Sequence, residues 1–296
     1  MYEPNICLYH EDCTDGFGAA WAIHRRWPTC TFIPATYGAP LELDDIEGKN
    51  ILFVDFSAPA DVLQAMVYEG KANSVIVIDH HKSAKEALAG LSTFGPEYPI
   101  SSPYWHESSK VVVYFDMNRS GAGMAWQFAH GTSAPDMIEL IEDRDLWRFR
   151  YPDTKPFIAA LNSYPQDFQV WDRLVLRVDE LVSDGEAILR ANGAAVETML
   201  KQAYTGLIAG HDVPLVNAPK QFSSDACHRL LEINPQAPFV ASWHRRGDGL
   251  LEFSLRSQDH RQDVSEVAKL FGGGGHRNAA GFQLEMISHG HNVGAV

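Results

Sequence analysis

The sequence predicts an α/β protein with a parallel-sheet N-terminal domain, a helical connector and a smaller C-terminal α/β domain. In the first half, short runs of branched apolar residues alternate with helix-like segments, a pattern typical of a parallel sheet covered by helices. The second half begins with a strongly helical stretch and continues with a hairpin signal. With 296 residues, of which 45% are hydrophobic, the chain is long enough for two packed cores. The predicted limits are 1–170, 171–210 and 211–296.

The N-terminal strands are predicted from apolar runs that polar or turn residues bound. Ser74–Ile78 shows this most clearly because Asn73 and Asp79 flank it. The predicted strands are Ile6–Tyr9, Thr31–Ala35, Ile51–Val54, Ser74–Ile78 and Val111–Phe115. The predicted helices are Gly16–Trp27, Ala60–Tyr68, Gly121–His130 and Pro135–Ile141.

The connector is predicted from Trp171 to about Tyr204, and Ser183-Asp184-Gly185-Glu186 resembles a capping box that opens a helix inside it. Beyond it, the predicted strands are Val213–Val216, Phe239–Trp243, Leu250–Leu255 and Ala279–Leu284. The predicted helices are Asp225–Leu231 and Val264–Phe271. The tetraglycine run at 272–275 is expected to form a flexible, amide-rich loop beside His276.

Composition excludes several function classes. The formal net charge of −14 disfavours a protein that coats long nucleic acid by charge alone. The four cysteines form no C-x-x-C pair, so neither a disulfide framework nor a structural zinc site is expected. The N-terminus lacks the pattern of a signal peptide and no apolar stretch reaches 18 residues, which predicts a cytoplasmic protein.

Acidic and histidine residues follow several predicted elements. A run from His10 to Gly16 follows the first strand, Asp55 follows the strand at 51–54, and Asp79-His80-His81 follows the strand at 74–78. Because the carboxyl ends of parallel strands meet at one edge of a sheet, Asp15, Asp55 and His80 are expected to converge. Carboxylates with imidazoles suit Mn²⁺, Mg²⁺ or Zn²⁺.

Each of these features also has a simpler structural interpretation. A single Asp after an apolar strand is a turn or cap residue in about three cases of four. Ser120 at the start of a helix is favoured as a simple cap over an anion site by about two to one. Asp145 is either a substitute for Asp143 or the ion-pair partner of nearby arginines, and the sequence leaves both open. Several such clusters in order, followed by a glycine–histidine run, make coincidence a poor explanation.

The order of these motifs, ending in Ser254-Leu255-Arg256-Ser257 and Gly272–His276 with Ala279-Ala280-Gly281, resembles the DHH phosphoesterase superfamily. The resemblance spans nearly the whole chain and is to the branch with a C-terminal DHH-associated domain, which includes RecJ nucleases, nano-RNases and pAp phosphatases. It implies that two divalent ions, with Mn²⁺ the first expectation and Mg²⁺ or another divalent metal the alternative, activate water against a phosphoester. The implied substrates are short oligonucleotides, dinucleotides or nucleoside bisphosphates, hydrolysed to mononucleotides.

The resemblance also assigns roles to residues. The metal ligands it implies are His10, Asp12, Asp15, Asp55, His80 and Asp143. Asp55 would bridge the two ions, His81 would contact the scissile phosphate, and Asp79 would orient His80 through a hydrogen bond. The phosphate-binding residues it implies are Arg256, Gly273, Gly274, Gly275 and His276.

One position departs from the family pattern. Cys13 lies two residues before Asp15, where an Asp ligand often occurs, so either Asp12 supplies that ligand or the first metal is held more weakly; we favour Asp12. Two other functions stay open: an inorganic pyrophosphatase or polyphosphatase, and a nucleotide-binding regulator with a degenerate metal site. The sequence leaves open cleavage polarity, RNA against DNA, the preferred metal and the oligomeric state, a homodimer included.

Overall fold

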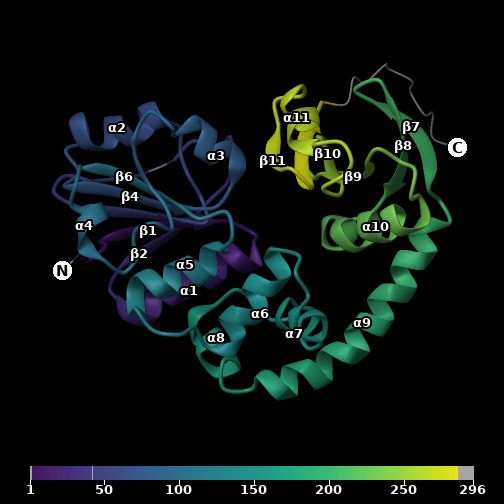
Figure 1. Cartoon of the computed structure of the whole chain (residues 1–296). Helices are drawn as coiled ribbons and strands as arrows, with labels where there is room; N and C mark the ends of the chain where they lie inside the picture. The colour runs from purple at the N-terminus through teal and green to yellow at the C-terminus, as the bar shows by residue number, and fades with distance from the viewer. Residues whose placement is uncertain (1, 42, 286–296) are drawn as a thin grey trace, which may run out of the picture. The chain divides into compact units, whose positions relative to one another are not determined.

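The computed structural model describes residues 2–41 and 43–285 and divides the chain into two compact units, 1–189 and 190–296. Each unit contains one six-stranded sheet, which confirms the predicted α/β class (Figure 1). The domain limits given above stay a prediction. Among the described residues, no helix combines the length and the apolar character needed to span a membrane.

All the strand pairs in the sheet of the first unit are parallel, and the strand order is β2-β1-β3-β4-β6-β5. Its strands are β1 (Ile6–His10), β2 (Thr31–Ala35), β3 (Asn50–Val54), β4 (Ser74–Asp79), β5 (Ser92–Phe94) and β6 (Val111–Phe115). The chain runs outward in one direction from β1 to β2 and in the other from β3 to β4. The carboxyl ends of the neighbouring strands β1 and β3 therefore form a topological switch point, where α/β proteins bind ligands.

Alternate residues of the central strands pack into two cores. On one face, Phe53 and Val77 pack with residues of α2 (Ala60–Tyr68) and α3 (Lys82–Ala87). On the other face, Leu52 and Ile76 pack with residues of α1 (Thr14–Arg26) and α5 (Gly121–His130), and Figure 1 shows α2 and α3 on the side of the sheet away from α1 and α5. Strands buried on both faces explain why the sequence shows continuous apolar runs there.

Most of the remaining helices of this unit pack with α1 and α5 around a third core that includes Trp21 and Trp171. They are α6 (Asp136–Asp145), α7 (Thr154–Leu161), α8 (Phe168–Leu174) and the first part of α9 (Val178–Leu200). The short helix α4 (Pro103–His106) lies near β6 instead, and its Trp105 belongs to the second core. The capping box predicted at Ser183 is wrong, because α9 already begins at Val178 and Ser183 lies in its interior. Asp179 and Glu180 fill the first turn instead, where acidic residues complement the helix dipole.

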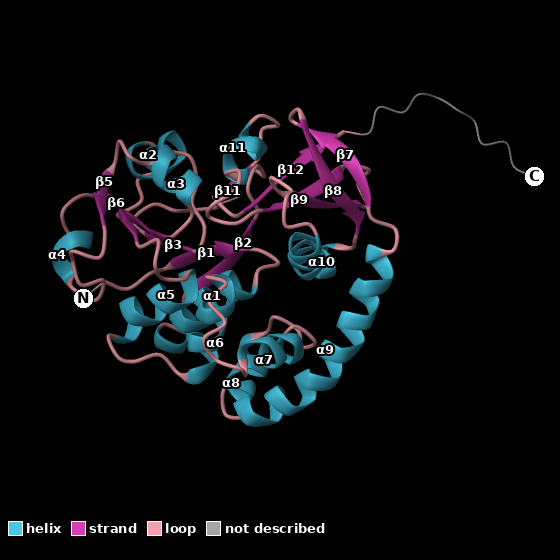
Figure 2. Ribbon diagram, turned by 45° about the vertical axis from the view of Figure 1, so that its right-hand side comes forward, coloured by secondary structure: helices cyan, strands magenta, loops and turns pink. Residues whose placement is uncertain are grey.

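The second unit has a mixed sheet in the order β11-β12-β10-β9-β8-β7, in which only β8 and β9 pair in parallel (Figure 2). Its elements are β7 (Tyr204–Ile208), β8 (His211–Asn217), α10 (Lys220–Ile233), β9 (Val240–Arg245), β10 (Leu251–Arg256), α11 (Val264–Lys269), β11 (Gly274–His276) and β12 (Ala279–Leu284). The predicted hairpin is confirmed by the antiparallel pairing of β9 with β10. Separate cores hold α10 and α11 against the sheet.

The expectation of a flexible glycine loop is wrong in part. Gly274–His276 forms strand β11, which pairs with β12. A Cβ on Gly273 would lie 2.0 Å from the carbonyl oxygen of Gly281, and Gly275 has φ +137°. The glycines therefore serve close backbone packing as well as turning, since only glycine fits both requirements.

Candidate metal centre

The switch point between β1 and β3 gathers most of the metal ligands expected from the sequence. His10 is the last residue of β1, and Asp55 directly follows β3. Gly16 allows the first turn of α1 to pack against His10, because a Cβ there would lie 2.3 Å from the His10 carbonyl oxygen. This return of the chain places Asp15, which is buried, beside the end of β3.

Asp55 lies at the centre of the cluster and is 1% exposed. Its Oδ1 lies 2.9 Å from His80 Nε2, while its Oδ2 lies 3.6 Å from His10 Nδ1 and 3.7 Å from Cys13 Sγ. Its backbone has φ +54°, a left-handed conformation that is uncommon for a non-glycine residue. The two oxygens of one buried carboxylate thus face two separate groups of donor atoms.

Asp79, the last residue of β4, is buried and anchors the two histidines that follow it. Its Oδ1 accepts hydrogen bonds from the backbone N–H of His80 at 2.6 Å and of His81 at 3.0 Å, and lies 2.7 Å from His81 Nδ1. The expectation that Asp79 orients the ring of His80 needs correction, because its ring partner is His81. The His80 ring instead points to Asp55, with Asp15 Oδ2 3.6 Å from His80 Nε2.

Asp145, not Asp143, completes this group. Asp145 Oδ2 lies 3.6 Å from His80 Nε2. Asp143 is buried, and its carboxylate accepts hydrogen bonds from the backbone N–H groups of Arg150 and Tyr151 and from the Thr154 hydroxyl. From the sequence, Asp143 and Asp145 were both expected to follow a helix that ends near Ile141, but α6 continues to Asp145. Residues two positions apart point to different sides of a helix, so only one of the two reaches the cluster.

Asp12 also differs from expectation. It lies in the turn between β1 and α1 with φ +52° and its side chain is exposed. In the described part of the chain, the donor atoms within 4.8 Å of one another around His10 and Asp55 include Cys13 and not Asp12. The left-handed turn at Asp12 brings the next residue, Cys13, toward Asp55.

Asp15 has a second set of contacts that the sequence did not reveal. Its two oxygens accept hydrogen bonds from the backbone N–H groups of Gly121 and Ala122 at 2.6 and 3.0 Å, so it caps the start of α5. The Ser120 side chain accepts from Gly123 N, as the simpler interpretation of that residue predicted. A carboxylate offers about four lone-pair sites, so Asp15 retains acceptor capacity for a cation.

The electrostatics of the cluster favour a bound cation. Burial and the neighbouring charges of Asp145 and Asp55 raise the pKa of Asp15 well above its usual value. Burial, together with the charge of Asp55, likewise raises the pKa of Asp145. Burial alone would raise the pKa of Asp55, but contacts with His10 and His80 and the nearby imidazole charges lower it. Asp15 and Asp55 are buried and Asp145 beside them is exposed, and carboxylates this close together repel one another and are stabilised by positive charge.

The arrangement of the donor atoms also fits divalent ions. The ligand-type atoms form one group from His10, Cys13 and Asp55 and a second group from Asp15, His80 and Asp145. The Nδ1 atom of His10 is buried 3.6 Å from Asp55 Oδ2 and has no hydrogen-bond partner among the described residues. A buried polar atom without a partner is costly, and a metal ion at this point would satisfy it.

In the second unit, the sheet aligns two of the predicted phosphate-binding residues. Arg256 on β10 and His276 on β11 both pair with Ala279 on the strand between them. Directly opposite residues in antiparallel strands project to the same face, so both side chains flank the small Ala279. Arg256 also donates hydrogen bonds to Ser224 Oγ on α10 and to the Leu255 carbonyl oxygen.

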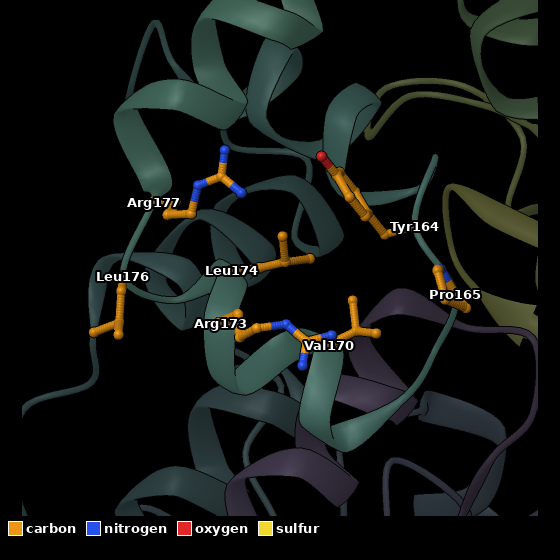
Figure 3. A pocket seen from close by; sticks show the side chains of 7 residues that line it. All are labelled: Tyr164, Pro165, Val170, Arg173, Leu174, Leu176 and Arg177. Atoms are coloured by element: carbon orange, nitrogen blue, oxygen red, sulfur yellow. The ribbon is translucent and has the colours of Figure 1, made fainter.

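A separate pocket of about 470 Å³ lies beside α8 in the first unit (Figure 3). It is lined by Tyr164, Pro165, Val170, Arg173, Leu174, Leu176 and Arg177. The close-up shows no residue predicted from the sequence as a site residue among those that line it. It is therefore distinct from the carboxylate–histidine cluster.

Comparison with known proteins gives two curated relatives. The uncharacterized protein R106 of Acanthamoeba polyphaga mimivirus is 30% identical over 308 residues, which cover 96% of this chain and 68% of that protein. Oligoribonuclease NrnB of Bacillus subtilis is 25% identical over 240 residues, which cover 73% of this chain and 54% of that protein, so the chain spans about half the length of the oligoribonuclease. No family model matches the chain. Among solved structures, the pGpG-specific phosphodiesterase PggH from Vibrio aligns over 95% of this chain and 93% of its own, with 11% identity and a TM-score of 0.45.

Proposed function

The chain belongs to the DHH phosphoesterase superfamily, and from this we propose that it is a divalent-metal-dependent hydrolase that cleaves short oligonucleotides or dinucleotides to mononucleotides. The observation that carries the proposal is the cluster of Asp15, Asp55, His80 and Asp145 at the switch point of a parallel sheet. Similarity to a protein named as an oligoribonuclease supports the nucleotide substrate.

In this proposal, His10 and Asp55 would hold one ion, and Asp15, His80 and Asp145 would hold the other. Asp55 lies between the two groups, with one oxygen toward each, which suits a bridging carboxylate. When bound, two divalent ions supply an acidified water and offset the charge that develops on phosphoryl oxygens. Mn²⁺ is the first cation to test, with Mg²⁺ as the alternative.

His81 is proposed to act on the substrate. Its Nδ1 is held 2.7 Å from Asp79, which directs the ring, and Nε2 is the nitrogen proposed to act on the substrate. Although burial opposes it, the charge of Asp79 raises the pKa of His81 and favours the protonated ring. A protonated Nε2 donates a hydrogen bond to a phosphoryl or leaving-group oxygen. Asp79 is a positioning residue for this ring.

The second unit is proposed to bind a terminal phosphate of the substrate. Arg256 and His276 flank Ala279 on one face of the sheet, and the backbone amides of Gly273–Gly275 lie in the same segment. A guanidinium and an imidazole bind phosphate through charge-assisted hydrogen bonds, and backbone amides add to such a site; of these amides, Gly273 N–H already donates to the Ala268 carbonyl oxygen. This arrangement favours short substrates with an accessible end, as does the net charge of −14.

The test compares three substrates with protein that has been stripped of metal and resupplied with Mn²⁺ or Mg²⁺. The dinucleotide pApA, 3′-phosphoadenosine 5′-phosphate and inorganic polyphosphate are incubated with wild type and Asp55→Asn. We expect mononucleotide from pApA with wild type only, and only with metal present. Turnover of polyphosphate alone would replace the proposal with a polyphosphatase. Nucleotide binding without any turnover would replace it with a regulator.

A further inference from the structure

Cys13 occupies a position that ordinary cysteine roles do not explain. Cys7 and Cys30 are packed in the core around β1 and α1, and Cys227 is packed in the core of the second unit. Cys13 belongs to neither core and is only partly buried. It lies in the turn between β1 and α1, with its Sγ 3.7 Å from Asp55 Oδ2.

The surroundings of Cys13 oppose a role as a nucleophile. Burial and the charges of Asp55, Asp15 and Asp145 raise the pKa of the thiol well above its usual value. Cys13 is the N-cap of α1, a position that favours a thiolate, but the three carboxylates beside it oppose a thiolate in the absence of a cation. The same carboxylates are the ones that attract a metal ion, which deprotonates a coordinating thiol.

The spacing of the three donors matches the edges of a tetrahedral metal site. Asp55 Oδ2 lies 3.7 Å from Cys13 Sγ and 3.6 Å from His10 Nδ1, and the three donor atoms all lie within 4.8 Å of one another. For zinc-type bond lengths, tetrahedral geometry places sulfur, nitrogen and oxygen ligands about 3.4–3.6 Å apart. The Nδ1 atom of His10 is buried and has no hydrogen-bond partner in the part of the chain that the structure describes, which is a second sign of a ligand here.

We propose that Cys13 is a thiolate ligand, so that the group formed by His10, Cys13 and Asp55 selects a cation of borderline softness such as Zn²⁺, Co²⁺ or Fe²⁺ over Mn²⁺ and Mg²⁺. This inference rests on the proposed function, because it concerns one of the two cation positions assigned there. A thiolate carries the same charge as the aspartate often found in the family at this point, so the total charge of the site is kept. The sulfur ligand changes which metal ion the site prefers, because thiolates favour softer cations than carboxylates do.

Cobalt provides a readout that does not depend on activity. Full-length protein is stripped with a chelator and titrated with Co²⁺ while absorption is followed. We expect a near-ultraviolet sulfur-to-cobalt charge-transfer band and tetrahedral visible bands in wild type. Cys13→Ser and Cys13→Asp should lose the charge-transfer band, and Cys30→Ser, which changes a cysteine outside the cluster, should keep it. Thermal unfolding of each metal-free variant checks that it is folded.

Competition between ions tests the stated preference. We expect Cys13→Asp to shift the Zn²⁺:Mn²⁺ affinity ratio toward Mn²⁺ by at least about tenfold, since the donor atom sets selectivity. A charge-transfer band that persists in Cys13→Ser, or cobalt bound to wild type without that band, overturns the role of Cys13 and leaves the proposed function standing. Absence of any bound divalent ion in wild type defeats the proposed function itself.

Discussion

At the scale of single residues, the chain separates similar carboxylates into different tasks through their neighbours. Asp145 faces His80 at 3.6 Å, whereas the carboxylate of Asp143 accepts hydrogen bonds from Thr154 and from the backbone of Arg150 and Tyr151. Asp55 faces two groups of donors at once. The identity of a residue predicts what it can bind, but its position on an element decides what it meets.

Asp145→Asn and Asp143→Asn should therefore have opposite effects. Asp145→Asn should weaken divalent-ion binding by at least about tenfold, because ligand and neighbouring positions tune metal affinity by about 10–100-fold. It should leave the stability of the metal-free protein unchanged or higher, since it removes one of several crowded carboxylates. Isothermal titration with Mn²⁺ and thermal unfolding in chelator measure the two effects.

Asp143→Asn should lower stability and spare ion binding. Burial alone would raise the pKa of Asp143, but the hydrogen bonds from Thr154 and from the Arg150 and Tyr151 backbones lower it. A group with a lowered folded pKa contributes stability above its unfolded pKa and loses it as pH falls through the folded value. We expect a loss of about 1–3 kcal/mol at neutral pH that shrinks in acid, measured by urea unfolding. A loss that does not change with pH would contradict this role.

At the scale of helices and strands, the sequence predicts those features that depend on the local pattern of residues. The central strands were predictable because branched apolar runs such as Val75–Ile78 have one common fate, burial in a parallel sheet. The convergence of Asp15, Asp55 and His80 was predictable because strand ends share an edge. The pairing of Gly274–His276 with β12 was not, because it depends on a partner strand rather than on local pattern. The end of α6 was placed four residues too early, and this exchanged Asp143 for Asp145.

The packing of α5 against the end of β3 gives a test at this scale. A Cβ on Gly121 would lie 2.4 Å from Asp55 Cβ, so this helix can begin here only with glycine. Gly121→Ala should displace either α5 or Asp55, since overpacking commonly costs about 1–3 kcal/mol. We expect lower thermal stability and weaker ion binding together.

A matched control for Gly121→Ala is Gly193→Ala in α9. Apart from its chain neighbours and the backbone of its own helix, no described heavy atom lies within 4 Å of the position where its Cβ would be added. Alanine favours helix over glycine by about 1 kcal/mol, so this variant should be as stable as wild type or more stable. Equal behaviour of the two variants in thermal unfolding and ion titration would show that the close approach of Gly121 to Asp55 has no consequence.

At the scale of the whole molecule, the two units contain different chemistry. The first holds acidic and imidazole donors, and the second aligns a guanidinium with an imidazole on one face of its sheet. Cation-binding groups and anion-binding groups are the two halves that hydrolysis of a phosphoester requires. The sequence order alone predicts this division, but not which carboxylates complete the cluster.

Divalent ions should stabilise the folded protein. A ligand that binds only the native state raises stability by about 2.7 kcal/mol at a free concentration of 100 times its Kd. Mn²⁺ or Zn²⁺ should therefore raise the Tm of wild type, and chelator should reverse the change. Asp55→Asn should show a much smaller shift. A shift in Asp55→Asn as large as that of wild type would place the bound ion elsewhere.

We propose that the cluster around Asp55 binds divalent ions for hydrolysis of a phosphodiester. The release of mononucleotide from pApA by metal-stripped protein, with and without added Mn²⁺, in wild type and Asp55→Asn measures this activity. We expect metal-dependent release by wild type and a loss of more than about a hundredfold in Asp55→Asn, because removing a ligand costs more than removing its supporting contacts. Release that persists in Asp55→Asn, or that needs no metal, would contradict it.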